Sequence, residues 1–393
     1  METSPLPKRD IVVIGASAGG VEALRGFFHA LPAGLEAAFL VVLHIPADTP
    51  SQLDRVLGYS TQLPVDIAQD GEPIRNGHVY VASADRHLMA TAQGIRLSRG
   101  PKEGRSQPSV DVLFRSTAKD LDALGFADHD AKRWEQLVQR PYGIILVTGP
   151  TGSGKTTTLY STLKRLATEA VNVSTVEDPI EMIEPSFNQT QVQPHLDFDF
   201  PEGLRALMRQ DPDIIMVGEI RDLQTAEMAV QAALTGHLVF STLHTNDAPS
   251  AVSRLMELGV PSYLINATLL GVLAQRLVRT LCSHCRQPDE NAKRETLAEL
   301  VKPWHINGGY RPYKPVGCVD CRMTGFRGRM GLYELLTVTE SFKEKVSKEP
   351  NIDALRRQAI TEGMRPLRLA GALKVAEGLT TIEEILATTP PLA

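Results

Sequence analysis

Short apolar runs alternate with amphipathic stretches along most of the chain, which favours a mostly parallel sheet with helices on its faces. A first pattern of this kind occupies about the first 120 residues and changes near residue 65 to shorter strands and turns. Its predicted elements are strands over 11–14 and 38–44, a helix over 21–30, antiparallel pieces over 78–82 and 95–98, a loop over 100–108 and a helix over 110–118.

A second α/β pattern begins near residue 143. It predicts strands over 143–148, 171–176, 213–217 and 238–242, and helices over 155–167, 203–210 and 222–234. The apolar run at 265–274 predicts a core helix, and residues 340–386 predict short helices. No apolar run reaches the roughly 20 residues that a membrane-spanning helix needs.

Length and composition narrow the class of protein. With 393 residues the chain is long enough for two or three domains, and its hydrophobic fraction of 42% is typical of globular proteins. The 41 basic and 46 acidic residues give a net charge of −5, so we expect no nucleic-acid partner. Lys8 and Arg9 precede a short apolar strand that opens into a Gly-rich turn, which is not the pattern of a secretory signal. We therefore expect a cytoplasmic chain.

A phosphate-binding loop lies between the predicted strand at 143–148 and the predicted helix at 155–167. The segment reads GPTGSGKT, and its glycines allow successive backbone N–H groups to surround a phosphate. Lys155 would reach the β- and γ-phosphates of ATP, and the Thr156 hydroxyl would bind Mg²⁺. The alternative is a Gly-rich turn that only joins strand to helix. The predicted nucleotide-binding residues are Gly149, Pro150, Thr151, Gly152, Ser153, Gly154, Lys155, Thr156 and Thr157.

A second acidic position follows the buried strand predicted at 213–217. Ligands of doubly wound sheets bind at the carboxyl edge of the strands, where Glu219 would lie beside the phosphates. There its carboxylate could hold the Mg²⁺ shell or polarise the attacking water. The alternative is a surface acid after a buried strand.

The four cysteines form two C-x2-C pairs. This spacing suits a tetrahedral Zn²⁺ with four thiolate ligands, which leaves no open position and therefore predicts a structural role. The alternatives are two redox pairs or free thiols. The predicted zinc ligands are Cys282, Cys285, Cys318 and Cys321.

The N-terminal turn contains a G-x-S-x-G sequence centred on Ser17. Such an elbow exposes a serine hydroxyl at the top of a sheet, and His44, at the end of the next predicted strand, could act as its base. A phosphate-binding turn and a structural histidine are the alternatives.

Four segments of the second pattern resemble motifs of the ATPases of type II secretion and type IV pilus assembly. The segments GPTGSGKTTTL, VEDPIE, VGEIRD and TGHLVFSTLHTN are similar to the Walker A, Asp box, Walker B and His box of that family, over about residues 121–387. The resemblance implies a hexameric ring that works with inner-membrane platform proteins and uses ATP and Mg²⁺. It gives Glu177 the placement or deprotonation of the attacking water, Glu219 the Walker B role and His244 the sensing of the γ-phosphate. His237 is then the first histidine of its box, and Arg221 a structural or intersubunit residue.

The cysteine module resembles the metal-binding insertion of the assembly and secretion members, which retraction ATPases lack. The resemblance therefore points to assembly or secretion. It also implies a preceding domain that supplies arginines to the nucleotide site, for which residues 1–118 offer no counterpart.

The first segment resembles a different family. IGASAGGVEAL, VVLHIP, DGEPIRNGHVYVASADRHLM and PSVDVLFRSTA are similar to the catalytic domain of the CheB-type chemotaxis receptor methylesterases. The resemblance makes Ser17 the nucleophile and His44 the histidine of a Ser-His-Asp triad acting on receptor glutamate methyl esters. It ends near Ala118, and no G-x-G-x-D-G stretch with the third member follows. Because loss of the orienting acid can lower the rate about 10⁴-fold, we expect a poor or inactive esterase.

The expected architecture is therefore α/β throughout. Residues 1–118 form a truncated, partial Rossmann-like methylesterase domain, and residues 119–393 a P-loop (RecA-like) ATPase domain with a zinc module at about 280–325 and a helical part at about 335–393. The expected function is ATP-driven pilin assembly or secretion. The alternatives are a receptor methylester hydrolase, with chemoreceptors as partners, and a non-catalytic nucleotide-binding chimera. We expect a cytoplasmic location, with peripheral placement at the inner face of the cell membrane as the alternative.

Overall fold

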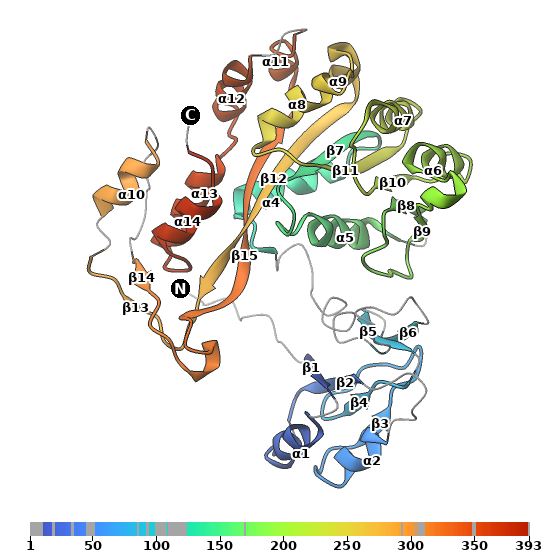
Figure 1. Cartoon of the computed structure of the whole chain (residues 1–393), viewed down its shortest axis with the longest axis vertical. Coiled ribbons are helices and arrows are strands. Elements are labelled where there is room, and N and C mark those ends of the chain that lie inside the picture. Colours follow the sequence, from blue (N-terminus) through green and yellow to red (C-terminus); the bar gives the residue numbers. More distant parts are fainter. Residues whose placement is uncertain are drawn as a thin grey trace. The chain divides into compact units, whose positions relative to one another are not determined.

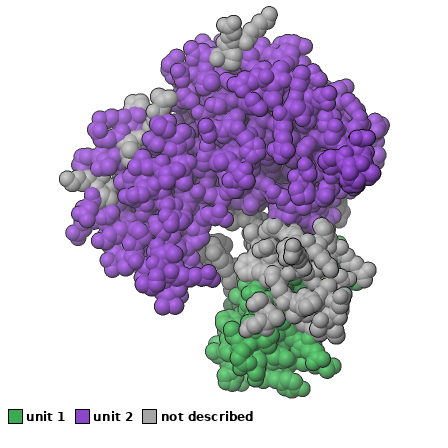
Figure 2. Space-filling model, in the orientation of Figure 1, with its two compact units in different colours: residues 1–119 green, residues 120–393 purple. Residues whose placement is uncertain are grey.

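Two compact units make up the chain, residues 1–119 and 120–393, and each is described by itself (Figure 2). The predicted helix at 110–118 and all of the predicted loop except Pro108 lie outside the described residues. The computed structural model describes residues 11–17, 20–32, 35–44, 52–84, 86–91, 94–98, 108, 124–168, 170–291, 294–302, 304, 311–347 and 351–391.

The first unit is built on a four-stranded parallel sheet in the order β1-β2-β4-β3 (Figure 1). Strands β5 and β6 form a separate antiparallel ladder. The elements are β1 (Ile11–Ser17), α1 (Val21–His29), β2 (Ala38–His44), α2 (Leu53–Gly58), β3 (Val65–Ile67), β4 (Val79–Val81), β5 (His87–Thr91) and β6 (Gly94–Ser98).

The prediction of an antiparallel piece at 78–82 was wrong, whereas the one at 95–98 was right. Strand β4 is fully buried, with Val79 and Val81 in one apolar cluster and Tyr80 in another. A strand buried on both faces is what a parallel α/β sheet requires. The sequence pattern of so short a strand carries no information on the direction of its neighbours.

The second unit is built on a seven-stranded sheet in the order β15-β12-β7-β11-β10-β8-β9 (Figure 1). All neighbours are parallel except β15, which is antiparallel to β12. The strands are β7 (Gly143–Thr148), β8 (Val173–Glu177), β9 (Asn188–Gln191), β10 (Ile214–Val217), β11 (Leu238–Leu243), β12 (Leu269–Leu281) and β15 (Phe326–Thr337).

Helices cover both faces of this sheet, because successive residues of its strands face opposite sides. Ile145 and Val147 of β7 pack with α4 and α5, while Ile144 and Leu146 pack with α6 to α9 and with the C-terminal helices. The helices are α4 (Asp128–Val138), α5 (Lys155–Leu166), α6 (Phe200–Leu207), α7 (Leu223–Leu234), α8 (Ala248–Glu257), α9 (Ser262–Thr268), α11 (Glu340–Lys343), α12 (Ile352–Thr361), α13 (Leu367–Ala376) and α14 (Ile382–Thr388).

The helix predicted at 265–274 is correct only at its start, because α9 ends at Thr268 and β12 begins at Leu269. In β12 the side chains of Val272 and Ala274 join one core cluster and Leu273 joins the other, as in a strand buried on both faces. A continuous apolar run of this length fits a buried strand as well as a buried helix.

Besides the 3-10 turn η3 (Pro194–Leu196), the remaining elements lie in the cysteine module, whose short ladder pairs β13 with β14. They are β13 (Gln287–Pro288), α10 (Arg294–Leu300), β14 (Tyr313–Lys314) and the 3-10 turn η4 (Val319–Cys321). Among the described residues, no helix is both long and apolar enough to cross a membrane.

Candidate nucleotide site and metal centre

The P-loop follows β7 and ends at Thr156, the second residue of α5. Its three glycines, Gly149, Gly152 and Gly154, have φ angles of 152°, 77° and 88°, a region that side chains with a Cβ rarely adopt. Gly149 is also tightly surrounded, since an added Cβ would lie 2.5 Å from the Gln275 carbonyl oxygen. The loop conformation therefore depends on glycine, as the motif predicts.

Lys155 lies over this loop, and its ammonium donates to the carbonyl oxygens of Gly149 and Pro150 at 2.9 and 3.2 Å. Burial lowers the pKa of Lys155, whereas the carboxylates of Glu219 and Glu181 oppose this shift. The Lys155 side chain is thus held next to the backbone that would surround a phosphate. The predicted magnesium ligand Thr156 is half-buried on the first turn of α5, next to exposed Thr157.

Two motifs meet at the carboxyl edge of the sheet. Glu219 follows β10, and His244 follows the neighbouring strand β11. The Glu219 carboxylate forms an ion pair with Arg221 and lies 3.4 Å from Nε2 of His244. The hydroxyl of Thr242 donates to the Gly218 carbonyl at 2.8 Å and so joins the two strand ends. The predicted acid and the predicted γ-phosphate sensor are therefore neighbours.

Glu177 ends β8, but its side chain is only 4% exposed and is enclosed by donors. The Tyr160 hydroxyl lies 2.8 and 2.7 Å from its two oxygens, the Thr175 hydroxyl 2.7 Å from one, and the Gln189 amide 3.2 Å from the same one. Burial raises the pKa of Glu177, although these hydrogen bonds oppose the shift. Glu181, in the same motif, is exposed.

His237 lies at the opposite edge of the sheet, because it precedes β11. Its Nδ1 is 2.8 Å from the Ala232 carbonyl oxygen and 3.1 Å from the Thr235 hydroxyl, at the end of α7. The structure therefore does not bring His237 together with the P-loop.

Two residues of β12 contribute to the P-loop although no motif marked them. The Gln275 side chain accepts a hydrogen bond from Thr158 at 2.8 Å, and Gln275 closely approaches Gly149 and Gly154. The guanidinium of Arg276 is 6% exposed and donates to the Asn246 carbonyl at 2.8 Å. A buried Gln-Arg pair in an otherwise apolar strand was the signal in the sequence that could have drawn attention to this region.

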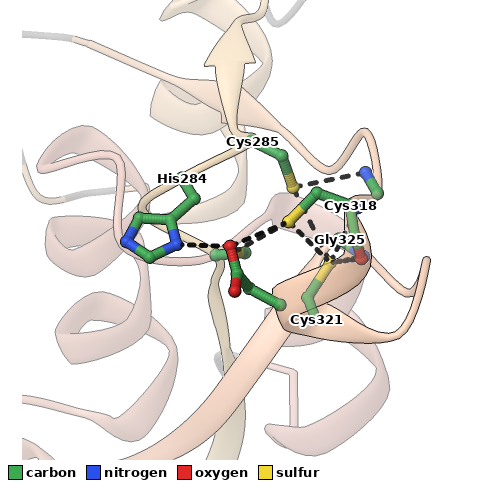
Figure 3. Close-up of polar contacts among 8 residues, drawn as sticks. His284, Cys285, Cys318, Cys321 and Gly325 are labelled. Atoms are coloured by element: carbon green, nitrogen blue, oxygen red, sulfur yellow. Dashed lines mark hydrogen bonds and ion pairs between the residues drawn. The ribbon is translucent and has the colours of Figure 1, made fainter. Parts of the chain in front are cut away.

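The four cysteines converge although about 30 residues separate the two pairs. Their sulfur atoms all lie within 4.8 Å of one another (Figure 3). The sulfur atoms of Cys282 and Cys318 are 3.9 Å apart, those of Cys285 and Cys321 3.8 Å, and those of Cys318 and Cys321 3.7 Å. These separations are too long for a disulfide, whose sulfurs are about 2.05 Å apart. They match four sulfurs about 2.3 Å from one tetrahedral zinc ion, so the cluster could bind Zn²⁺.

Backbone donors surround the sulfurs. The N–H groups of Cys318 and Gly325 point at Cys321 Sγ at 3.1 and 3.2 Å, and that of Gly317 at Cys285 Sγ at 3.3 Å. Burial opposes ionisation of Cys321, but the N–H groups of Cys318 and Gly325 and the neighbouring thiols lower its pKa to about 6, while burial and the neighbouring thiols raise the pKa of the Cys318 thiol to about 11. A thiolate is the form that binds metal, so the donor set fits a zinc site.

Comparison with known proteins is consistent with this geometry. The family model for type II/IV secretion system proteins matches residues 87–387. The chain belongs to this family. A second model, for CheB methylesterase, matches residues 12–126. The chain therefore joins a segment of the CheB methylesterase type to a secretion-family ATPase core.

Curated proteins share a large part of this sequence. The chain is 56% identical over 280 residues to the type IV pilus assembly ATPase TfpB of Acinetobacter baylyi, across 71% of this chain and 47% of that protein. It is 43% identical over 329 residues to the type II secretion system ATPase E of Vibrio cholerae, across 83% of this chain and 63% of that protein. The chain thus spans less than two thirds of the length of these relatives.

A solved structure shows the same fold. The ATPase DotB of Legionella pneumophila superposes with a TM-score of 0.52 at 23% identity, covering 77% of this chain and 71% of that chain. This likeness supports the α/β assignment for the secretion-family core and nothing about its substrate.

In the CheB-like unit, Ser17 and His44 end the neighbouring parallel strands β1 and β2 and are opposite each other in the register. The structure describes the backbone of these two residues and not their side chains. The sequence predicted that both residues lie on the carboxyl edge of this sheet, and the backbone register agrees with that prediction.

Proposed function

We propose that this chain binds ATP with Mg²⁺ at its P-loop and hydrolyses it, as a subunit of a ring that drives pilin assembly or protein secretion. The observation that carries the proposal is the convergence of the P-loop, Glu219 and His244 on one carboxyl edge of the sheet. The similarity to a pilus assembly ATPase and a secretion ATPase supports the same function.

Each residue has a role that follows from its chemistry. Lys155 and the P-loop N–H groups would bind the β- and γ-phosphates, and Thr156 would hold the metal. Bound Mg²⁺ neutralises charge that develops on the transferring phosphate. Glu219 would orient the metal shell or the attacking water, and His244 would contact the γ-phosphate, with Arg221 holding the Glu219 carboxylate.

The acid that activates water is the open assignment. The family resemblance gave this role to Glu177, but Glu177 is only 4% exposed and three side chains donate to its carboxylate, which leaves a water little access to it. Glu181 is exposed and its charge acts on Lys155. We therefore propose Glu181 as the water-activating acid. Glu181→Gln should then lower the rate of ATP hydrolysis and leave ATP binding intact. If Glu177→Gln lowers the rate in this way and Glu181→Gln does not, Glu177 is the water-activating acid.

Hydrolysis of Mg²⁺-ATP by the full chain tests the main proposal. Lys155→Ala should abolish turnover. Lys164→Ala is the matched control, because Lys164 lies on the same helix and pairs with Glu184 at 3.1 Å away from the P-loop motif. ATP binding without turnover in the parent chain would identify a non-catalytic nucleotide-binding protein.

Ring formation and partners belong to the same proposal. A hexamer should form or be stabilised with Mg²⁺ and a non-hydrolysable ATP analogue, measured by sedimentation velocity. A chain that stays monomeric with bound nucleotide would contradict the ring. Inner-membrane platform proteins are the proposed partners, and the cytoplasmic face of that membrane is the proposed location.

For the CheB-like unit we propose little or no esterase activity. The register places Ser17 beside His44, but no matching aspartate stretch follows in the sequence. Hydrolysis of a nitrophenyl ester should be equal in the parent and Ser17→Ala. Turnover that depends on Ser17 would instead support a receptor methylester hydrolase, with chemoreceptors as partners.

A further inference from the structure

Residues 244–247 follow β11 and include His244, the proposed γ-phosphate sensor. Two buried side chains form hydrogen bonds with the backbone of this segment. The backbone N–H of Thr245 donates to the Thr148 hydroxyl at 2.9 Å, at the end of the P-loop strand. Arg276 binds the carbonyl of the next residue, Asn246, at 2.8 Å. Both Thr148 and Arg276 are buried, so these contacts are shielded from water.

Asp247 ends the segment and connects it to the C-terminal helices. One carboxylate oxygen caps α8 by accepting from Ser250 N at 2.8 Å, and the other forms an ion pair with Arg356 of α12 at 2.7 Å. The two side chains are only 13% and 21% exposed. An ion pair this well shielded is stronger than a surface pair, for which screening by water removes most of the attraction.

The sensor itself has little support from its own side chain. The His244 side chain is 50% exposed, and its Nε2 lies 3.4 Å from the Glu219 carboxylate, which is long for a hydrogen bond. The position of its imidazole is therefore set mainly by the backbone that carries it. That backbone is fixed at one end by β11 and at the other by Asp247.

We propose that Arg356 is a positioning residue for the γ-phosphate site, acting through Asp247 on the backbone that carries His244. The inference rests on the proposed function, because it assumes that His244 contacts the γ-phosphate. Without Arg356, Asp247 keeps its cap on α8 but loses its link to α12, and residues 244–247 gain freedom. The P-loop itself keeps its contacts with Gln275 and Arg276.

The consequence is selective for the γ-phosphate. On the proposed function, ADP would contact the P-loop through its β-phosphate and would lack the γ-phosphate that His244 contacts. A non-hydrolysable ATP analogue would have that contact, so loss of position should weaken binding of the analogue and not of ADP. A hydrogen bond to a charged group contributes enough that removing His244 should lower the preference for the analogue over ADP about 10-fold or more.

The experiment measures the affinities of AMP-PNP and ADP, each with Mg²⁺, by calorimetry on the full chain. The variants are His244→Ala, Arg356→Gln, the double variant and Arg356→Lys. We expect Arg356→Gln to lower the AMP-PNP preference roughly 3- to 10-fold with ADP affinity unchanged, and the double variant to match His244→Ala, because both act on one contact. Arg356→Lys should restore part of the preference.

Asp353→Asn is the matched control. Asp353 binds the same guanidinium at 3.0 Å but is 67% exposed, so its removal leaves the Asp247 pair in place and should not change the preference. Additive effects in the double variant, or equal loss of ADP affinity in Arg356→Gln, would overturn the proposal. If His244→Ala lowers the preference and Arg356→Gln does not, the inference fails and the proposed function stands. If His244→Ala has no effect, the proposed role of His244 fails, and the inference with it.

Discussion

Glu334 is a carboxyl group buried where two helices begin, and its replacement should change how stability depends on pH. It lies in β15, is 4% exposed, and accepts from the N–H groups of Ala248 at 2.8 Å and Leu367 at 3.0 Å. These are the first residues of α8 and α13. Burial and the negative charge of Asp247 raise the pKa of Glu334, whereas the two N–H donors and the positive charge of Arg356 lower it. The net result is a pKa of about 7.

The direction of the pH effect follows from the raised pKa. A carboxyl group whose pKa is higher in the folded chain than in the unfolded chain favours the folded state while it is protonated. This contribution to the free energy of unfolding is fully present below the unfolded-state pKa and is lost as the pH rises through the folded-state pKa. For Glu334 the window runs from 4.5 to about 7. Because one pKa unit corresponds to about 1.4 kcal/mol, ionisation of Glu334 should lower the free energy of unfolding by ~3 kcal/mol across that window.

Glu334→Gln removes this titration and one of the two hydrogen bonds, since an amide nitrogen cannot accept from an N–H. A buried donor left unpaired costs about 1–3 kcal/mol. At pH 5 the parent chain should therefore be the more stable of the two. By pH 8 the difference should shrink to near zero or reverse, because only the parent has lost ~3 kcal/mol.

Urea unfolding at pH 5, 6, 7 and 8 tests this, followed by the fluorescence of the two tryptophans, of which Trp134 is fully buried in the second unit. Groups common to both proteins cancel in the difference between parent and variant. Glu340→Gln, at a side chain 87% exposed, is the control and should give a difference that does not vary with pH. A constant difference between the parent and Glu334→Gln from pH 5 to 8 would refute the reasoning.

Three further outcomes are expected. Removal of zinc with a chelator should lower the thermal stability of the cysteine module and release about one metal ion per chain, measured colorimetrically; no bound metal in the chain as isolated from zinc-supplemented cells would contradict the site. Tyr160→Phe should destabilise the chain by about 1–3 kcal/mol, because Glu177 loses a buried donor, whereas Tyr142→Phe at an exposed ring should not. Gly271→Ala should destabilise it by about 1–3 kcal/mol, since the new methyl would lie 2.8 Å from a carbonyl oxygen of β15, while Gly218→Ala meets only ordinary contacts at 3.4 Å; denaturant midpoints compare both pairs.

The features that the sequence predicted well are those that local chemistry determines. The P-loop was recognisable because its glycines must adopt positive φ angles, and all three do. The strands at 143–148 and 238–242 were recognisable as short apolar runs between helical stretches, and both lie in the sheet as β7 and β11. The spacing of the cysteine pairs likewise predicted sulfur atoms close enough for one metal ion.

The features that it predicted poorly depend on partners far away along the chain. Whether the run at 265–274 is helix or strand depends on its neighbours β7 and β15, and residues 326–337 of the latter lie more than 50 positions further on. The two acids of the Asp box present the same difficulty. Glu177 and Glu181 look alike in the motif, and the difference arises because Tyr160, on another element, binds only the first.

The C-terminal helices present the same problem on a larger scale, and their contacts argue that they belong to the catalytic fold. In the sequence, residues 335–393 read as short helices after the motifs end. In the structure, the Arg356 guanidinium pairs with Asp247, and the Leu367 N–H donates to Glu334. Both of these buried acids also accept hydrogen bonds from backbone N–H groups in the first turn of α8. Buried acids of this kind are unfavourable without their partners. The nucleotide edge therefore depends on α12 and α13 for its present form, and Asp247 connects these helices to the backbone that carries His244, the proposed γ-phosphate sensor.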